Sequence, residues 1–222
     1  MSRDPSFMAT APSADGPWST PRLVPLADCN RTYCQHDMNL DGLILANGSF
    51  VGLVKVHGRP HGAQHTLSEI HRVFAADWAD PTSYSQVPDN NGEDGNLFPS
   101  LTHGGLEDPD IYLDLNGRMH ALFHAEPGTG EDDGLTVTTG VRSGAHAWSE
   151  DGGHTWTLTG IAFNSTVAFE DGSVTVFSRR ERPHLVFGDP GRPHTPTHLS
   201  TSVQYGGQYG DATYTLIQPL AR

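Results

Sequence analysis

A hairpin signature recurs three times along the chain at nearly even spacing, and this repeat constrains the fold more than any other feature. The three copies begin at Asn39, Asp108 and Arg182, so their starts lie 69 and then 74 residues apart. The turns that follow are Asn47-Gly48, Asn116-Gly117 and Pro190-Gly191. Asn-Gly pairs favour tight hairpins because both central positions accept a positive φ. A hairpin repeated at this spacing predicts the blades of a β-propeller.

The composition supports an all-β fold. Only 18% of the residues are charged, while 25 glycines and 16 prolines supply the turns that many short strands require. The second strand of the hairpin is largely apolar at 50–54 and 119–123, as expected of strands stacked between neighbouring sheets. One domain accommodates all 222 residues, so we predict a single all-β domain over 1–222.

The repeat also predicts where the blades lie. Residues 6–26 form the outer end of one blade, 39–84 and 107–163 form two further blades, and 166–222 begin another. A propeller needs at least about four blades to close its ring, and the chain supplies only about three with part of another. An open ring exposes sheet edges. We therefore expect a fragment, or a chain that pairs with another, and the oligomeric state is left open.

The segment Ser149–Trp156 (SEDGGHTW) fits the Asp-box pattern S-x-D-x-G-x-T-W. In such a turn an aspartate accepts hydrogen bonds from backbone amides, and the tryptophan packs between sheets. We therefore expect Asp151 and Trp156 to stabilise a turn, and we assign them no catalytic role.

The net charge limits which partners the protein can bind, and sorting and glycosylation signals indicate its cellular compartment. The formal net charge of -13 opposes nucleic-acid binding, because a phosphate backbone attracts basic surfaces. No apolar run reaches the roughly 18 residues that span a bilayer, and the start lacks the layout of a signal peptide. Glycosylation sequons begin at Asn30, Asn47 and Asn164, and Cys29 and Cys34 are spaced for a local disulfide. We expect a secreted glycoprotein whose N-terminal part is missing; two unpaired thiols are the alternative for the cysteines.

Three segments resemble the five-bladed propeller glycoside hydrolases of family 43 and the related invertase-like family 32. Leu106–Tyr112 (LEDPDIY) is similar to the family segment with an Asp-Pro pair, and Phe177–Leu185 (FSRRERPHL) to the later strand with a glutamate shortly before a proline. Phe7–Trp18 resembles the outer strands that end a blade. The resemblance covers most of the chain from Phe7 onward. It implies a five-bladed propeller hydrolase, of which this chain is an N-terminally incomplete copy.

The resemblance implies that Glu181 is the general acid and that Asp108 orients the substrate and tunes the pKa of the acid. Glycosidic hydrolysis needs an acid that protonates the leaving oxygen and a carboxylate that acts as base or nucleophile across the sugar ring. Burial and a second carboxylate nearby favour a protonated acid. The residues expected to contact the carbohydrate substrate are Asn39, Asp41, Glu107, Arg180, Arg182 and His184.

The base or nucleophile is not identified. The family places it on the first blade, whose inner strand is expected to precede Ser6. Asn39 matches Asp108 in the preceding repeat, but an amide is not a base. Asp37 and Asp41 flank Asn39, and one of them has to serve if the chain is complete.

Each of these residues has a plainer interpretation. In it, Glu181 pairs with a neighbouring arginine in a surface cluster, and Asp108 simply starts a turn before its proline. His120 and His124 face the same side of a regular strand, but two ligands do not make a metal site. We therefore predict no metal and no cofactor, although the family leaves room for a structural cation such as calcium.

Three function classes remain open at the level of the sequence. The first is a secreted glycosidase that hydrolyses an extracellular poly- or oligosaccharide. The second is a carbohydrate-binding or interaction propeller without catalysis, since a fold does not fix a function. The third is a sialidase-like protein, suggested by the Asp box and the arginines, although the arginine triad of such enzymes has no assignment in this sequence.

Overall fold

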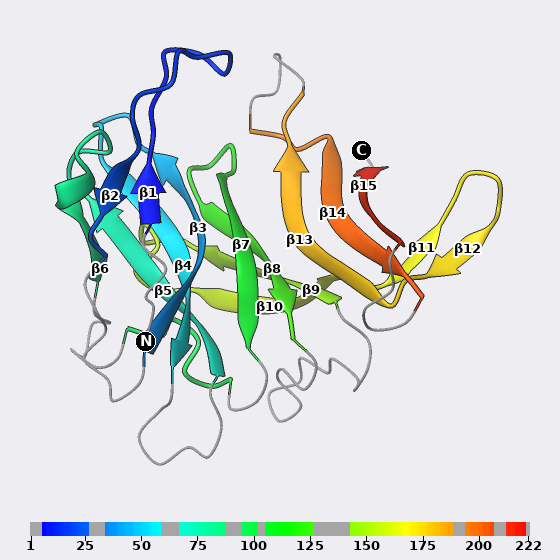
Figure 1. Ribbon diagram of the computed structural model, residues 1–222. Helices are drawn as coiled ribbons and strands as arrows, with labels where there is room; N and C mark the ends of the chain where they lie inside the picture. The colour runs from blue at the N-terminus through cyan, green and yellow to red at the C-terminus, as the bar shows by residue number, and fades with distance from the viewer. Residues whose placement is uncertain are drawn as a thin grey trace.

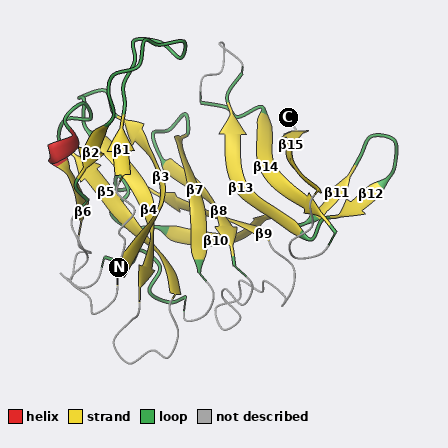
Figure 2. Cartoon of the chain, in the orientation of Figure 1, coloured by secondary structure: helices red, strands yellow, loops and turns green. Residues whose placement is uncertain are grey.

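Strands dominate the structure. The computed structural model describes residues 6–26, 34–58, 67–87, 95–101, 105–126, 143–188, 194–206 and 212–220. Helical structure in these ranges is limited to the 3₁₀ turn η1 (Pro81–Ser83), as Figure 2 shows. The predicted all-β class is therefore confirmed. Across the same ranges, no helix is long and apolar enough to cross a bilayer.

Two four-stranded antiparallel sheets form the larger part of the fold. The strands of the first sheet, in spatial order, are β3 (Cys34–Ile44), β4 (Phe50–Gly58), β5 (Leu67–Ala75) and β6 (Tyr84–Val87). The strands of the second are β7 (Leu106–Leu113), β8 (Met119–Ala125), β9 (Ser143–Ser149) and β10 (Thr157–Phe163). In both sheets each strand pairs with the next in sequence, so the chain moves steadily outward from the first strand.

A third sheet and two small hairpins complete the described fold. The third sheet contains β13 (Arg179–Val186), β14 (His198–Tyr205) and β15 (Ala212–Pro219). The hairpins are β1 (Ser6–Met8) with β2 (Arg22–Val24), and β11 (Thr166–Ala168) with β12 (Val174–Val176). The first strands of the three larger sheets lie next to one another, β7 between β3 and β13, and the other strands extend away from them (Figure 1). We call β3, β7 and β13 the inner strands.

Two of the three predicted turns are confirmed, and they have the conformation that their glycines allow. Gly48 joins β3 to β4 with φ +83°, and Gly117 joins β7 to β8 with φ +79°. A turn of the same hydrogen-bond pattern joins β11 to β12, with Gly172 at φ +82°. Pro190-Gly191 lies outside the described residues. Glycine suits these positions because residues with a side chain are strained at positive φ.

Apolar side chains fill the spaces between neighbouring sheets, but not to the same extent. The cluster between the first and second sheets includes Leu53, Ile70 and Phe123, each at most 1% exposed. The second and third sheets share a smaller buried cluster, which consists of Leu122, Phe163, Leu185 and Leu199. Burying one such side chain stabilises the fold by about 1.5 to 3 kcal/mol. The joint between the first two sheets is therefore the stronger apolar contact.

Each inner strand contains a break in its pairing register. The breaks lie between His36 and Leu40 in β3, between Glu107 and Asp110 in β7, and between Glu181 and His184 in β13. In β7 and β13 two residues oppose a single residue of the partner strand, which is a β-bulge. A bulge turns a side chain in a direction that a regular strand does not permit. The breaks fall at the residues where the sequence repeat begins.

The turn before β10 is held by the side chain of Asp151. This carboxylate accepts hydrogen bonds from the backbone amides of His154 (3.0 Å) and Thr155 (2.9 Å). Burial raises the pKa of Asp151, but the hydrogen bonds from Thr155, Ser149 and His154 outweigh it and lower the value to about 2. Trp156 packs against the apolar cluster of the first two sheets. The assignment of this turn as an Asp box stays a prediction.

Candidate functional site

Two equivalent residues on neighbouring inner strands have a left-handed backbone. Asp108 in the bulge of β7 has φ +51°, and Arg182 in the bulge of β13 has φ +55°. Each precedes a buried proline, Pro109 or Pro183. For a residue with a side chain this conformation costs about 1 to 2 kcal/mol, and such strain concentrates at functional sites. The matching pair therefore marks the bulges as the candidate site.

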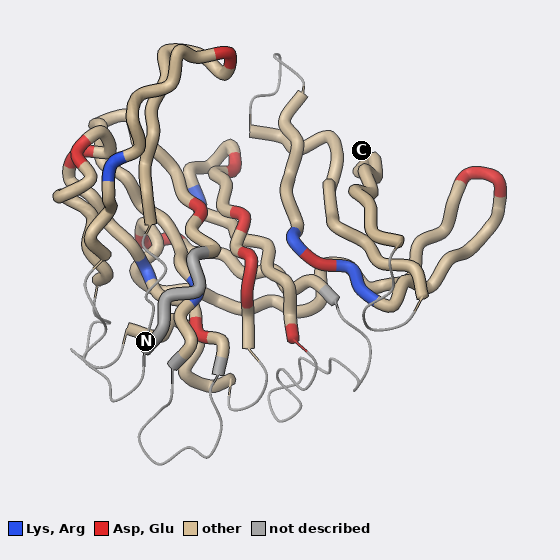
Figure 3. Tube along the Cα trace, in the orientation of Figure 1, with Lys and Arg blue, Asp and Glu red and all other residues tan. Residues whose placement is uncertain are grey.

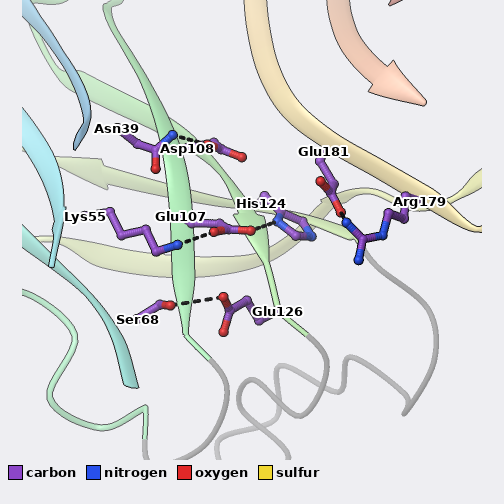
Figure 4. A network of polar contacts seen from close by, with 9 residues as sticks. All are labelled: Asn39, Lys55, Ser68, Glu107, Asp108, His124, Glu126, Arg179 and Glu181. Atoms are coloured by element: carbon purple, nitrogen blue, oxygen red, sulfur yellow. Dashed lines mark hydrogen bonds and ion pairs between the residues drawn. The ribbon is translucent and has the colours of Figure 1, made fainter. Parts of the chain in front are cut away.

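The carboxylate of Asp108 lies between two inner strands. Asn39 on β3 donates a hydrogen bond from Nδ2 to Asp108 Oδ1 (Figure 4). Burial, and then the negative charge of Glu107, raise the pKa of Asp108, and the positive charge of Arg182 is among the opposing effects. Two of the three residues that occupy equivalent places in the sequence repeat are thus in direct contact.

Glu107 forms the centre of a buried ionic group. Lys55 on β4 donates to its Oε2, and Nδ1 of His124 on β8 lies 2.6 Å from its Oε1 (Figure 4). Burial raises the pKa of Glu107, but the hydrogen bonds from His124 and Lys55 outweigh it and lower the value to about 2. The carboxylate is therefore ionised at neutral pH, so Nδ1 of His124 donates to it. The other ring nitrogen of His124 is buried and has no hydrogen-bond partner among the described residues.

Glu181 lies directly before the bulge of β13, and its carboxylate pairs with a side chain of the same strand. Nη1 of Arg179 lies 3.4 Å from Glu181 Oε1, and the Glu181 side chain is 16% exposed. In Figure 4 the carboxyl group of Asp108 points towards the β13 side, where Glu181 lies. Of the arginines considered as partners of Glu181, Arg179 forms this pair. The structure describes no hydrogen bond or ion pair of Arg182.

Arg180 points away from the candidate site and donates hydrogen bonds within and next to the third sheet. It is 2% exposed and donates to Thr201 Oγ1, to the carbonyl of Asn164 and to Gln218 Oε1. Its guanidinium also lies over the ring of Phe163. Adjacent residues of a strand face opposite sides of the sheet, which explains why Arg180 and Glu181 separate. The structure does not bring Arg180 to the other predicted site residues.

Two aspartates join successive inner strands through backbone amides. The amide of Ile111 on β7 donates to Asp41 Oδ2 on β3 (2.7 Å), and the amide of Leu185 on β13 donates to Asp110 Oδ2 on β7 (2.9 Å). The second aspartate also lies 2.6 Å from Nδ1 of His184. Burial raises the pKa of Asp41 to about 6 and also raises the pKa of Asp110. We call Asp41 and Asp110 the interstrand aspartates.

One group of described residues has the donors for a metal ion. Single ligand atoms of Glu107, Asp108 and His124 all lie within 4.8 Å of one another. Carboxylates and imidazole bind divalent cations, but the ammonium group of Lys55 already neutralises Glu107. The chemistry of these side chains therefore favours the ionic contacts of Glu107 with Lys55 and His124 over a bound cation. The absence of a metal, and the room for a structural cation, stay predictions.

Sequence reasoning found part of this arrangement. It selected Asn39, Asp108 and Glu107, which the structure places together, but it missed the partners of Glu107. Lys55 carried a usable signal, because it is a single charge within the apolar strand sequence FVGLVKVHG. A lysine is rarely buried unless it is paired, so this pattern indicates a hidden ion pair. The spacing of His124 from His120 raises only the question of a metal ligand, whereas in the structure Nδ1 of His124 bonds the carboxylate of Glu107.

Comparison with known proteins identifies the fold and not the family. No protein-family model and no curated protein match the sequence. A family 117 glycoside hydrolase of the marine bacterium Zobellia galactanivorans has a similar structure, with a TM-score of 0.53 and 14% identity over 96% of this chain and 57% of that one. An endo-arabinase from Bacteroides thetaiotaomicron matches with a TM-score of 0.48 and 16% identity, over 96% of this chain and 65% of the other. The chain spans little more than half the length of the family 117 structure.

The first of these similarities concerns the fold: the several antiparallel sheets of this chain are arranged like part of a propeller-type glycoside hydrolase. The glycosidase-like fold predicted from the sequence is thereby confirmed at the level of the fold. The five-bladed form, and membership of family 43 or family 32, stay predictions.

Proposed function

We propose that this protein hydrolyses glycosidic bonds of an extracellular poly- or oligosaccharide, with Glu181 as the general acid and Asp108 as the carboxylate that orients the substrate. The observation that carries the proposal is the matched pair of bulges on β7 and β13. Each bulge follows a glutamate and consists of a residue with positive φ and a buried proline, and the two bulges lie on adjacent inner strands. Carboxylates on facing strands are what acid and base catalysis across a sugar ring requires.

The frame around Asp108 suits its proposed role. Lys55 and His124 fix Glu107, the residue before Asp108, while Asn39 holds Asp108 itself. A carboxylate held on both sides keeps one orientation without reorganising when a substrate binds, and such preorganisation favours catalysis. The base remains to be assigned. Asp41 is the described carboxylate closest in sequence to Asn39, but its Oδ2 already accepts the amide of Ile111.

Replacing Glu181 tests the acid. We expect Glu181→Gln to lower the rate on polysaccharides by roughly 10²- to 10⁴-fold, because the leaving oxygen is no longer protonated. Aryl glycosides with acidic phenols need little protonation, so their cleavage should fall much less. Rates on both substrate types in a panel of sugars separate a lost acid from a damaged fold.

A matched control lies on the turn held by Asp151. Glu150 is an exposed glutamate that pairs with Arg118 at 3.0 Å, remote in sequence from the bulges. Glu150→Gln should leave both rates within about twofold, since surface ion pairs have little energetic effect. Equal loss on polysaccharides and aryl glycosides in Glu181→Gln would contradict the proposed acid.

Non-catalytic carbohydrate binding is the second candidate, and Asn39 favours it. This residue stands where the preceding repeat would need a carboxylate, and its amide is bonded to Asp108. If the protein only binds sugars, the unmodified chain binds without turnover. Asn39→Asp then places a carboxylate opposite Asp108, and measurable hydrolysis by this variant alone would favour the binding function for the natural chain.

We also propose that the protein is secreted and glycosylated. Asn47 and Asn164 are exposed, as glycosylation requires, whereas Asn30 and Cys29 lie outside the described residues. Expression in a secreting eukaryotic host, followed by removal of N-glycans, should shift the mass by the glycans at one or both sites. An unchanged mass would argue against this part of the proposal.

A further inference from the structure

Arg182 is an exposed cation at a strained position beside Asp108. Its backbone has φ +55°, which glycine or asparagine adopts at much lower cost. Its bulge matches that of Asp108 on the adjacent inner strand, and its charge is close enough to influence the pKa of that residue. A long charged side chain kept at such a position indicates a use that offsets the strain.

The other cations near the bulges are already paired. Lys55 is bonded to Glu107, and Arg179 lies 3.4 Å from Glu181. Among the residues that the structure describes, Arg182 has no hydrogen-bond or ion-pair partner. Figure 3 shows basic residues on both sides of an acidic one at the start of β13, next to the acidic stretch of β7. The guanidinium of Arg182 is therefore available to a ligand.

The acidic charge of the whole chain indicates which ligands need an exposed arginine. A chain with net charge -13 repels anions at long range, so an anionic sugar gains entry only if a local cation compensates. Beyond roughly 10 Å such repulsion is screened by salt, and the nearest charges decide. A guanidinium binds planar oxyanions with two parallel hydrogen bonds, which suits a uronate carboxylate or a sulfate ester.

We propose that Arg182 binds an anionic substituent of the sugar beside Asp108, so that the substrates of this protein are acidic polysaccharides that carry carboxylate or sulfate groups. This inference rests on the proposed carbohydrate site and names the substrate class that the site accepts. Arg182 is a specificity residue in this arrangement and takes no part in proton transfer.

The test measures binding and sugar release with matched polysaccharide pairs. One pair is polygalacturonate and its methyl-esterified form; the other is carrageenan and its desulfated form. We expect the protein to bind one charged member roughly ten to a hundred times more tightly than its neutralised partner, as a charge-assisted bidentate contact requires. The pair that shows the preference distinguishes carboxylate from sulfate.

Variants at position 182 assign the preference to one side chain. Arg182→Asn removes the charge and tolerates positive φ, so it should fold as well as the natural chain in thermal unfolding and lose the preference. Arg182→Lys should keep part of it, because the charge remains while the bidentate geometry is lost. Arg118→Gln removes an exposed arginine elsewhere and should leave the preference unchanged.

The outcomes separate this inference from the proposed hydrolysis. The inference is overturned if the protein binds the charged and neutral members of both pairs equally. It is also overturned if Arg182→Asn still binds the charged member more tightly. If Arg182 only tunes Asp108, Arg182→Asn lowers sugar release from charged and neutral members alike, which also overturns it. Tighter binding of a charged polysaccharide without any sugar release supports the role of Arg182 and contradicts the proposed hydrolysis. Sugar release from the neutral polysaccharides alone supports the proposed hydrolysis and contradicts this inference.

Discussion

Strands β7 and β13 contain the same bulge, a residue at positive φ and a buried proline directly after a glutamate, yet the two bulges have different surroundings. In β7, Glu107 is bonded by Lys55 and His124, which are 3% and 0% exposed. In β13, Glu181 pairs with Arg179 of its own strand, at the longer distance of 3.4 Å.

The same backbone device therefore stands in two different environments. The bulge of β7 is built into a buried ionic group that fixes its position, while the bulge of β13 presents Arg182 and His184 to the solvent. Buried charges are costly unless they are paired, so the first bulge depends on every member of its group. The second has its cation Arg182 exposed, so that this side chain can reach a ligand.

Breaking the buried group should have the largest effect on stability. Glu107→Gln leaves the ammonium of Lys55, whose side chain is 4% exposed, without its counter-charge, and should lower the free energy of unfolding by about 3 to 5 kcal/mol. Glu181→Gln at the equivalent place should cost less than half as much, because the Arg179 side chain that it leaves is 25% exposed and can be hydrated. Urea denaturation of the two variants measures this contrast, and equal losses would show that the bulges are not differently anchored.

The interstrand aspartate that holds β7 should make stability depend on pH. Burial raises the pKa of Asp41 to about 6, above its value in the unfolded chain, so the folded protein binds this proton more tightly. The associated stability is full below about pH 4 and is lost as the pH rises through about 6. Asp41→Asn should lack this dependence, so its stability relative to the natural chain should rise by about 2 kcal/mol between pH 4 and pH 7. Denaturation curves at both pH values check the sign.

Substitutions of Asp110 and of His184, its equivalent on β13, should differ by a smaller amount in the free energy of unfolding. Asp110→Ala leaves the buried amide of Leu185 without its acceptor and should cost about 1 to 2 kcal/mol. His184→Ala removes a 71% exposed ring that lies 2.6 Å from Asp110 but keeps the acceptor of the Leu185 amide, so it should cost less, about 0.5 to 1 kcal/mol. Hydrogen exchange at the amide of Leu185 should accelerate only in Asp110→Ala; the same acceleration in His184→Ala would remove the distinction between the two strands.

The parts of the fold that depend on neighbouring residues could be predicted from the sequence. The turns at Gly48 and Gly117 follow from Asn-Gly pairs between apolar runs, which is a local signal. The matching places of Asp108 and Arg182 were visible because each precedes a proline at the same point of the repeat. Their positive φ was not, because proline restricts the preceding residue without selecting a left-handed backbone.

The contacts that build the site could not be predicted in the same way. Lys55 reaches Glu107 from another sheet, 52 positions away, so the contact depends on how the two sheets pack. His124 opposes Glu107 only because the bulge of β7 sets the register beyond it. A shift of one residue would turn either side chain to the opposite face. Such contacts follow from register and packing, which a single sequence does not specify.

The interstrand aspartates have a consequence for how such a protein can change over time. Asp41 and Asp110 bind the amides of Ile111 and Leu185, and every amino acid except proline supplies that amide. The alignment of neighbouring strands is therefore insensitive to which side chains stand at the joined positions. Side chains along the inner strands can therefore be substituted in evolution or by design while the mutual alignment of the strands is inherited unchanged.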